Sequence, residues 1–109
     1  MDTFTALADP TRRSIIEMLA RRGELTATDI SDRFNVSPPA ISQHLKVLRK
    51  VKLLRMEKRA QKRIYSIDTI GLSEIEDWLI SMRRMWNKRF DALDKLLADE
   101  KKKPRRGKK

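Results

Sequence analysis

The stretch from Ser37 to Lys50, SPPAISQHLKVLRK, combines side chains that could bind a nucleic acid along one face of a helix. Ile41, Leu45 and Leu48 recur at intervals of four and three residues, which predicts a buried apolar face. The opposite face contains no acidic residue and carries Pro39, Ser42, Gln43, Lys46, Arg49 and Lys50. Ser, Gln, Lys and Arg are side chains that hydrogen-bond base edges and phosphates in a major groove. A merely solvated face usually mixes both signs of charge, so this composition favours contact with an anion.

The residues before this stretch predict a helix that would hold it in place. In LTATDISDRF, residues 25–34, Thr26 can cap a helix and Asp29 suits its first turn. Ser37 can cap the next helix, and Val36 in the intervening turn is expected to be buried. Two helices joined by such a short turn have the spacing of a helix-turn-helix unit. In that unit the N-terminal residues of the second helix contact base edges.

A β-hairpin is predicted after the helix-turn-helix. LLRMEK (53–58) and RIYSID (63–68) are rich in apolar and β-forming residues and flank the turn RAQK. Basic side chains surround its tip, with Glu57 in opposition: Arg55, Lys58, Arg59, Lys62 and Arg63. The hairpin could act as a wing that reaches the DNA backbone, or it could be a solvated charged loop.

The two sets of side chains have different expected roles on DNA. Base edges would be read by the side chains near the start of the second helix, namely Ser42, Gln43 and Lys46, with Pro39 beside them. Phosphates would be held by residues of the helix and of the wing, namely Ser37, Arg49, Arg59, Lys62 and Arg63.

Two helices are predicted at the N-terminal end of the chain. DTFTALAD (2–9) resembles a short helix, and Asp9 can cap a second helix that ends at Gly23. Arg12 and Arg13 fall in the first turn of this second helix, where the helix dipole disfavours cations. Either solvent screens these two charges or a phosphate lies nearby.

Gly71 is expected to break the chain before a long final helix that starts at Leu72. Apolar residues in this helix step mainly by three and four: Leu72, Ile75, Leu79, Met82, Trp86, Leu93 and Leu96, with Phe90 and Leu97 beside them. This is more apolar surface than so small a domain can cover, which favours pairing with a second copy about a two-fold axis. Packing within a monomer is the alternative. The expected dimer contacts are Phe4, Leu7, Leu79, Met82, Trp86 and Phe90.

Composition limits the remaining function classes. The 109 residues carry a net charge of +11, and the last nine, KKKPRRGKK, contain seven of the basic residues and no acid. We expect one domain over residues 1–99 and a basic, disordered tail over residues 100–109. With no cysteine, a single histidine and no glycine-rich phosphate loop, the sequence predicts neither an enzyme nor a cofactor. No apolar run approaches the ~20 residues of a membrane span, so we expect a cytoplasmic, nucleoid-associated protein and no membrane partner.

Two further functional interpretations remain open. In the first, the protein is a sequence-tolerant, chromatin-like nucleic-acid binder whose tail and net charge supply the affinity. In the second, the final helix recruits another protein and DNA is incidental. The polar, acid-free face of residues 37–50 favours specific double-stranded DNA over both.

Three segments together carry a family resemblance. ALADPTRRSIIEML, DISDRFNVSPPAISQHLKVLRK and RIYSI resemble the ArsR-type winged-helix repressors, over roughly residues 4–98. The segment GLSEIEDWLISMRRMWNKRFDAL is similar to the subgroup whose last helix carries two tryptophans and no metal ligands. The resemblance implies a mainly α-helical winged helix-turn-helix with a small β-hairpin and a long C-terminal dimerisation helix. It also implies a homodimer that binds an imperfect palindrome and represses transcription.

The sequence departs from the family pattern at two kinds of position. Metal-sensing members have cysteines where this chain has Thr26 and Thr28, and the final helix has no histidine. Arsenite and tetrahedral Zn²⁺ therefore lack suitable ligands, and no metal is expected. The family usually has a glycine between the reading helix and the wing, where this chain has Lys52, and often one at the wing tip, where RAQK has none. The resemblance therefore leaves the geometry of the wing open.

Overall fold

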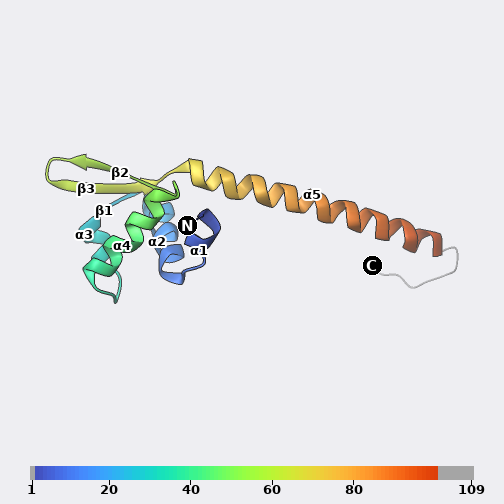
Figure 1. Ribbon diagram of the computed structural model, residues 1–109, viewed down its shortest axis with the longest axis horizontal. Coiled ribbons are helices and arrows are strands. Elements are labelled where there is room, and N and C mark those ends of the chain that lie inside the picture. Colours follow the sequence, from blue (N-terminus) through green and yellow to red (C-terminus); the bar gives the residue numbers. More distant parts are fainter. Residues whose placement is uncertain (1, 101–109) are drawn as a thin grey trace. The chain divides into compact units, whose positions relative to one another are not determined.

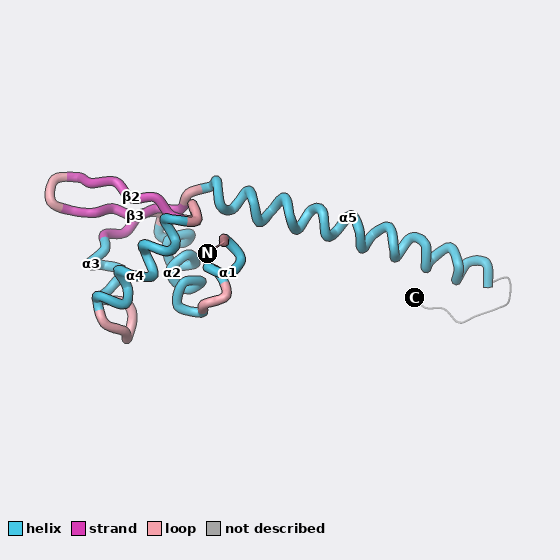
Figure 2. Tube along the Cα trace, in the orientation of Figure 1, coloured by secondary structure: helices cyan, strands magenta, loops and turns pink. Residues whose placement is uncertain are grey.

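The computed structural model describes residues 2–100, which form five helices and three strands (Figures 1 and 2). In chain order these are α1 (Thr3–Leu7), α2 (Pro10–Arg22), β1 (Glu24–Thr26), α3 (Ala27–Asp32), α4 (Pro38–Lys50), β2 (Leu54–Arg59), β3 (Lys62–Ile67) and α5 (Thr69–Glu100). The fold is mainly helical with one small antiparallel sheet, as predicted. The basic tail was expected over residues 100–109. Residue 100 ends α5, and the rest of the expected tail lies outside the described residues. The chain divides into two compact units, the first ending at Glu76 and the second beginning at Asp77.

The first unit is built around one apolar core, to which all of its helices and strands contribute. The buried side chains are Ala6, Ile15, Leu19, Leu25, Ile30, Ile41, Leu45, Leu48, Val51, Leu53, Leu54 and Tyr65. The predicted apolar face of α4 is confirmed, because Ile41 and Leu45 are 2% exposed and Leu48 is fully buried. Burial of each such side chain stabilises the fold by about 1.5–3 kcal/mol. These three residues therefore fix which face of α4 points outward.

The helix caps predicted from the sequence are confirmed. Asp9, Thr26 and Ser37 each accept a hydrogen bond from the backbone N–H three residues ahead, at 3.0, 3.0 and 3.3 Å respectively. The bond from the Arg12 backbone N–H lowers the pKa of the Asp9 carboxyl. The turn after α3 differs from expectation: Val36 is 41% exposed, because Phe34 is the residue that packs against the core there.

The sheet contains one strand more than the sequence predicted. Its order is β1-β3-β2, and both pairings are antiparallel. β1 pairs Leu25 with Tyr65, which brings the residues before α3 against the predicted hairpin. The hairpin pairing extends to Arg59 and Lys62, so only two residues of RAQK form the loop. A three-residue strand is too short to show alternation, which is why β1 was missed.

The backbone turns sharply at two positions without a glycine. Lys52, between α4 and β2, has a φ of 63°, and Ala60, in the hairpin loop, has a φ of 56°. Both angles fall in the left-handed region that glycine occupies most easily. These are the two places where the family resemblance leads us to expect glycine. The left-handed backbone conformation is therefore present at both turns, although a lysine and an alanine occupy the positions.

Gly71 lies within α5, and the expectation that it would break the chain before the final helix is wrong. The helix begins at Thr69, and the Gly71 backbone N–H donates a hydrogen bond to the carbonyl oxygen of Lys52 at 2.7 Å. A Cβ at residue 71 would lie 2.5 Å from that same oxygen. Glycine is therefore required here for the close approach of two backbone segments.

Replacing Gly71 with alanine should lower the free energy of unfolding by about 1–3 kcal/mol, because the added methyl group forces the start of α5 away from Lys52. Urea denaturation followed by circular dichroism would measure this change. Ser73→Ala, at an exposed position on the same helix, serves as the control and should change stability by less than about 0.5 kcal/mol. Equal stability of the two variants would contradict the close approach.

Candidate nucleic-acid interface

The outward face of α4 presents every side chain that the sequence assigned to it. Ser42, Gln43, Lys46 and Arg49 are exposed, and so are Ser37 and Pro39 at the start of the helix. The face carries no carboxylate. The last turn of the helix adds two basic residues, Arg49 and Lys50. Its N-terminal turn adds the partial positive charge of the helix dipole.

Ser37 can contribute to this face while it caps the helix. Its Oγ accepts the hydrogen bond from the Ala40 backbone N–H at 3.3 Å. A hydroxyl that accepts in this way still has its own O–H to donate. Ser37 therefore offers a donor to a phosphate oxygen at the N-terminus of α4.

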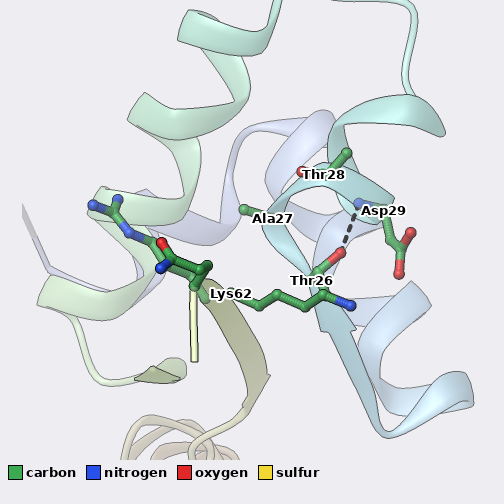
Figure 3. Close-up of a pocket in the computed structure, with 7 residues that line it drawn as sticks. Thr26, Ala27, Thr28, Asp29 and Lys62 are labelled. Atoms are coloured by element: carbon green, nitrogen blue, oxygen red, sulfur yellow. Dashed lines mark hydrogen bonds between the residues drawn. The ribbon is translucent and has the colours of Figure 1, made fainter. Parts of the chain in front are cut away.

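A cleft of about 480 Å³ lies between the start of α3 and the wing (Figure 3). Its lining residues are Thr26, Ala27, Thr28, Asp29, Gln61, Lys62 and Arg63. Lys62 and Arg63 are exposed at the start of β3, and Figure 3 shows the Lys62 side chain extending toward Thr26. The wing thus brings two cations close to the helix-turn-helix.

Across the described range, 2–100, no group of three or more His, Cys, Asp or Glu side chains could hold a metal ion.

Arg59 differs from the other predicted phosphate contacts because carboxylates already hold it. Its guanidinium bonds both oxygens of Glu24, at 2.9 and 3.2 Å, and one oxygen of Glu57 at 3.2 Å. These bonds raise the pKa of Arg59 and lower that of Glu57. Arg59 therefore links β2 to β1, and a phosphate would have to compete with two carboxylates for it. The sequence did not suggest this pairing, because Glu24 belongs to the strand that was missed.

Arg12 and Arg13 also make hydrogen bonds that the sequence did not suggest, while solvent screening and a nearby phosphate both stay open. The Arg12 Nε donates to the carbonyl oxygen of Ala6 at 2.6 Å, and the Arg13 Nη1 donates to that of Leu7 at 2.9 Å. Carbonyls at the end of a helix lack partners within the helix, and these two arginines satisfy those of α1. The position that looked unfavourable for α2 is thus favourable for α1.

His44, on α4, lies beside the same cluster. Its Nδ1 is 3.2 Å from the Arg12 Nη1 and 4.0 Å from an Asp9 carboxylate oxygen. The side chain is about one-fifth exposed. Arg12, in the first turn of α2, therefore contacts α4, the helix that carries Gln43 and Lys46.

The residues predicted for a dimer interface fall into two groups. Leu79, Trp86 and Phe90 are each about half exposed on α5, and the rings of Trp86 and Phe90 lie 5.6 Å apart. Phe4, on α1, is 39% exposed. Leu7 and Met82 are partly buried, Leu7 against the core of the first unit. The long run of half-exposed apolar residues on α5 is thus an observed feature, and its pairing with a second copy stays a prediction.

None of the helices formed by residues 2–100 is both long enough and apolar enough to cross a bilayer.

Residues 7–57 match a family model described as a helix-turn-helix domain. The chain is 36% identical over 80 residues to the transcriptional repressor SdpR of Bacillus subtilis, covering 73% of this chain and 88% of the relative. It is 36% identical over 97 residues to the HTH-type transcriptional regulator Rv2034 of Mycobacterium tuberculosis, covering 89% and 87%.

Solved structures agree with these sequence relatives. An ArsR-like transcriptional regulator from Rhodococcus sp. RHA1 superimposes with a TM-score of 0.72 at 28% identity, over 85% of this chain and 87% of the other. A protein described as a possible transcriptional regulator for arsenical resistance gives a TM-score of 0.64 at 34% identity, over 91% and 96%.

Proposed function

The chain belongs to the ArsR family of winged helix-turn-helix regulators and is a DNA-binding transcriptional regulator, and we propose that it represses transcription as a homodimer on a palindromic operator. The observation that carries this proposal is the exposed face of α4, which has no carboxylate and is held outward by Ile41, Leu45 and Leu48.

Base reading belongs to the side chains near the N-terminal half of α4. Ser42, Gln43 and Lys46 face base edges, with Pro39 beside them, because the start of the second helix of a helix-turn-helix enters the major groove. A glutamine can make two hydrogen bonds to the major-groove edge of adenine, and a lysine can donate to guanine. These pairings give sequence preference where charge alone would not.

Phosphate contacts orient the domain on the duplex. Ser37 and Arg49 contact the backbone from α4, and Lys62 and Arg63 contact it from the wing. Arg59 joins them if it exchanges a carboxylate partner for a phosphate. The repressor name of the relative SdpR supports the sign of regulation that we propose.

The dimer forms through α5 and α1. The half-exposed Leu79, Trp86 and Phe90, with Met82 beside them, would be covered by the same residues of a second copy, and Phe4 and Leu7 would extend the contact. A two-fold axis would set the two α4 helices about 34 Å apart, which is one turn of DNA.

The proposal includes neither a metal nor another cofactor. Thr26 and Thr28 bear hydroxyls, which are poor ligands for the soft ions that thiolates bind. We propose that the regulator acts in the cytoplasm, in association with the nucleoid.

A salt titration tests the proposal against the sequence-tolerant alternative. Binding to the DNA upstream of the protein's own gene is compared with binding to scrambled DNA of equal length, for the full chain and for residues 1–100. We expect a preference for the upstream DNA that survives near physiological salt and does not need the tail. If both DNAs bind alike and affinity disappears with salt or with the tail, the protein is a charge-driven nucleic-acid binder.

A further inference from the structure

One side chain, Arg12, joins three helices of the first unit. Its Nε donates to the carbonyl oxygen of Ala6, in α1, at 2.6 Å. Its Nη1 lies 3.2 Å from the Nδ1 of His44, in α4. Arg12 lies in the first turn of α2, and its backbone N–H donates to the carboxylate of Asp9, which caps that helix. A guanidinium has several donors in a fixed planar fork, so it can bond a helix carbonyl and an imidazole at the same time.

The contact with His44 has a defined polarity. A guanidinium nitrogen donates and never accepts, so the Nδ1 of His44 must be the acceptor. Arg12 thus contacts a residue that lies next to Gln43 on the reading helix.

We propose that Arg12 is a positioning residue that sets α4 relative to α1 through His44 and so determines operator specificity without touching DNA. The inference rests on the proposed function. The spacing of two half-sites depends on how each reading helix sits relative to the dimer interface. Arg12 connects the two, because α1 also carries Phe4, which we assign to that interface.

Arg13 provides a matched control in the neighbouring position. It also bonds carbonyl oxygens at the end of α1, those of Leu7 at 2.9 Å and Ala8 at 3.4 Å. Within residues 2–100 its hydrogen bonds reach the α1 segment and not α4. Arg12→Gln and Arg13→Gln remove the same charge and both remove hydrogen bonds to α1, but only the first breaks the connection to His44.

The experiment measures the affinity of the full chain for operator and scrambled DNA by fluorescence anisotropy at one salt concentration, together with thermal unfolding. We expect both variants to unfold at lower temperature. Arg12→Gln should lose at least about fivefold in operator affinity relative to scrambled DNA, the lower end of what one base contact contributes. Arg13→Gln should keep the wild-type preference.

A third variant separates positioning from folding. His44→Phe removes the acceptor and leaves the bond between Arg12 and Ala6, so it should reduce operator preference as Arg12→Gln does. If Arg12→Gln and Arg13→Gln keep or lose operator preference equally, or if His44→Phe keeps it, the inference is overturned. A wild-type chain without any operator preference would reject the proposed function itself, which is a separate and visible outcome.

Discussion

Replacing Leu79 with glutamate should turn the protein into a monomer and lower its operator affinity by about 100-fold or more. Leu79 is 54% exposed on α5, so the single chain tolerates a charge there. In a two-fold dimer the substitution would bury one unpaired carboxylate from each copy, which strongly opposes association. A monomer reads only one half-site, and giving up two or more base-specific interactions costs about 3 kcal/mol, or roughly 100-fold. Analytical ultracentrifugation and operator titration would measure the two effects.

Ser81→Glu is the matched control for this substitution. It adds the same charge to the same helix at an exposed position, about 200° around the helix axis from Leu79. It should leave both the oligomeric state and the operator affinity close to those of the wild type. A Leu79→Glu chain that remains dimeric, with its operator affinity intact, would show that α5 is not the dimer interface.

Gln43→Ala should reduce the preference for the operator by about 1–3 kcal/mol for each base that the glutamine reads, which is roughly 5- to 150-fold in relative affinity. The side chain is exposed on the acid-free face of α4 and does not contribute to the core. Affinity for scrambled DNA should change little, because the substitution removes no charge. Competition binding with operator and scrambled duplexes at fixed salt would measure the ratio.

The second glutamine of the chain provides the control. Gln61 is exposed in the hairpin loop and belongs to the wing. Gln61→Ala removes the same amide away from the reading face and should leave the operator preference unchanged. If Gln43→Ala weakens binding equally to operator and to scrambled DNA, then Gln43 does not read bases.

The sequence predicted well those features that depend on near neighbours. A cap at Asp9, Thr26 or Ser37 involves a backbone group only three residues away, so the residue types reveal it. The amphipathic character of α4 follows from the spacing of Ile41 and Leu45 along a single helix. Helix start, helix face and exposed chemistry are all local properties of this kind.

Features that join distant segments were missed or predicted wrongly. β1 exists because Leu25 pairs with Tyr65, forty residues further along the chain, and three residues alone show no strand pattern. The sequence pattern indicates a helix breaker at Gly71. In the structure, the lack of a side chain at this residue instead allows the Lys52 backbone to approach closely. Each of these depends on a partner that periodicity and composition cannot locate.

The functional face shows the same division. The sequence by itself determined that α4 presents Ser42, Gln43 and Lys46 on a face without carboxylates, because three buried side chains on the same helix dictate its orientation. Only the tertiary structure decided which cations of the first unit are already engaged. Arg59 is held by Glu24 from β1, and Arg12 bonds α1 and His44. A long, flexible basic side chain can hydrogen-bond to many acceptors, and the folded chain determines which of them lie within reach.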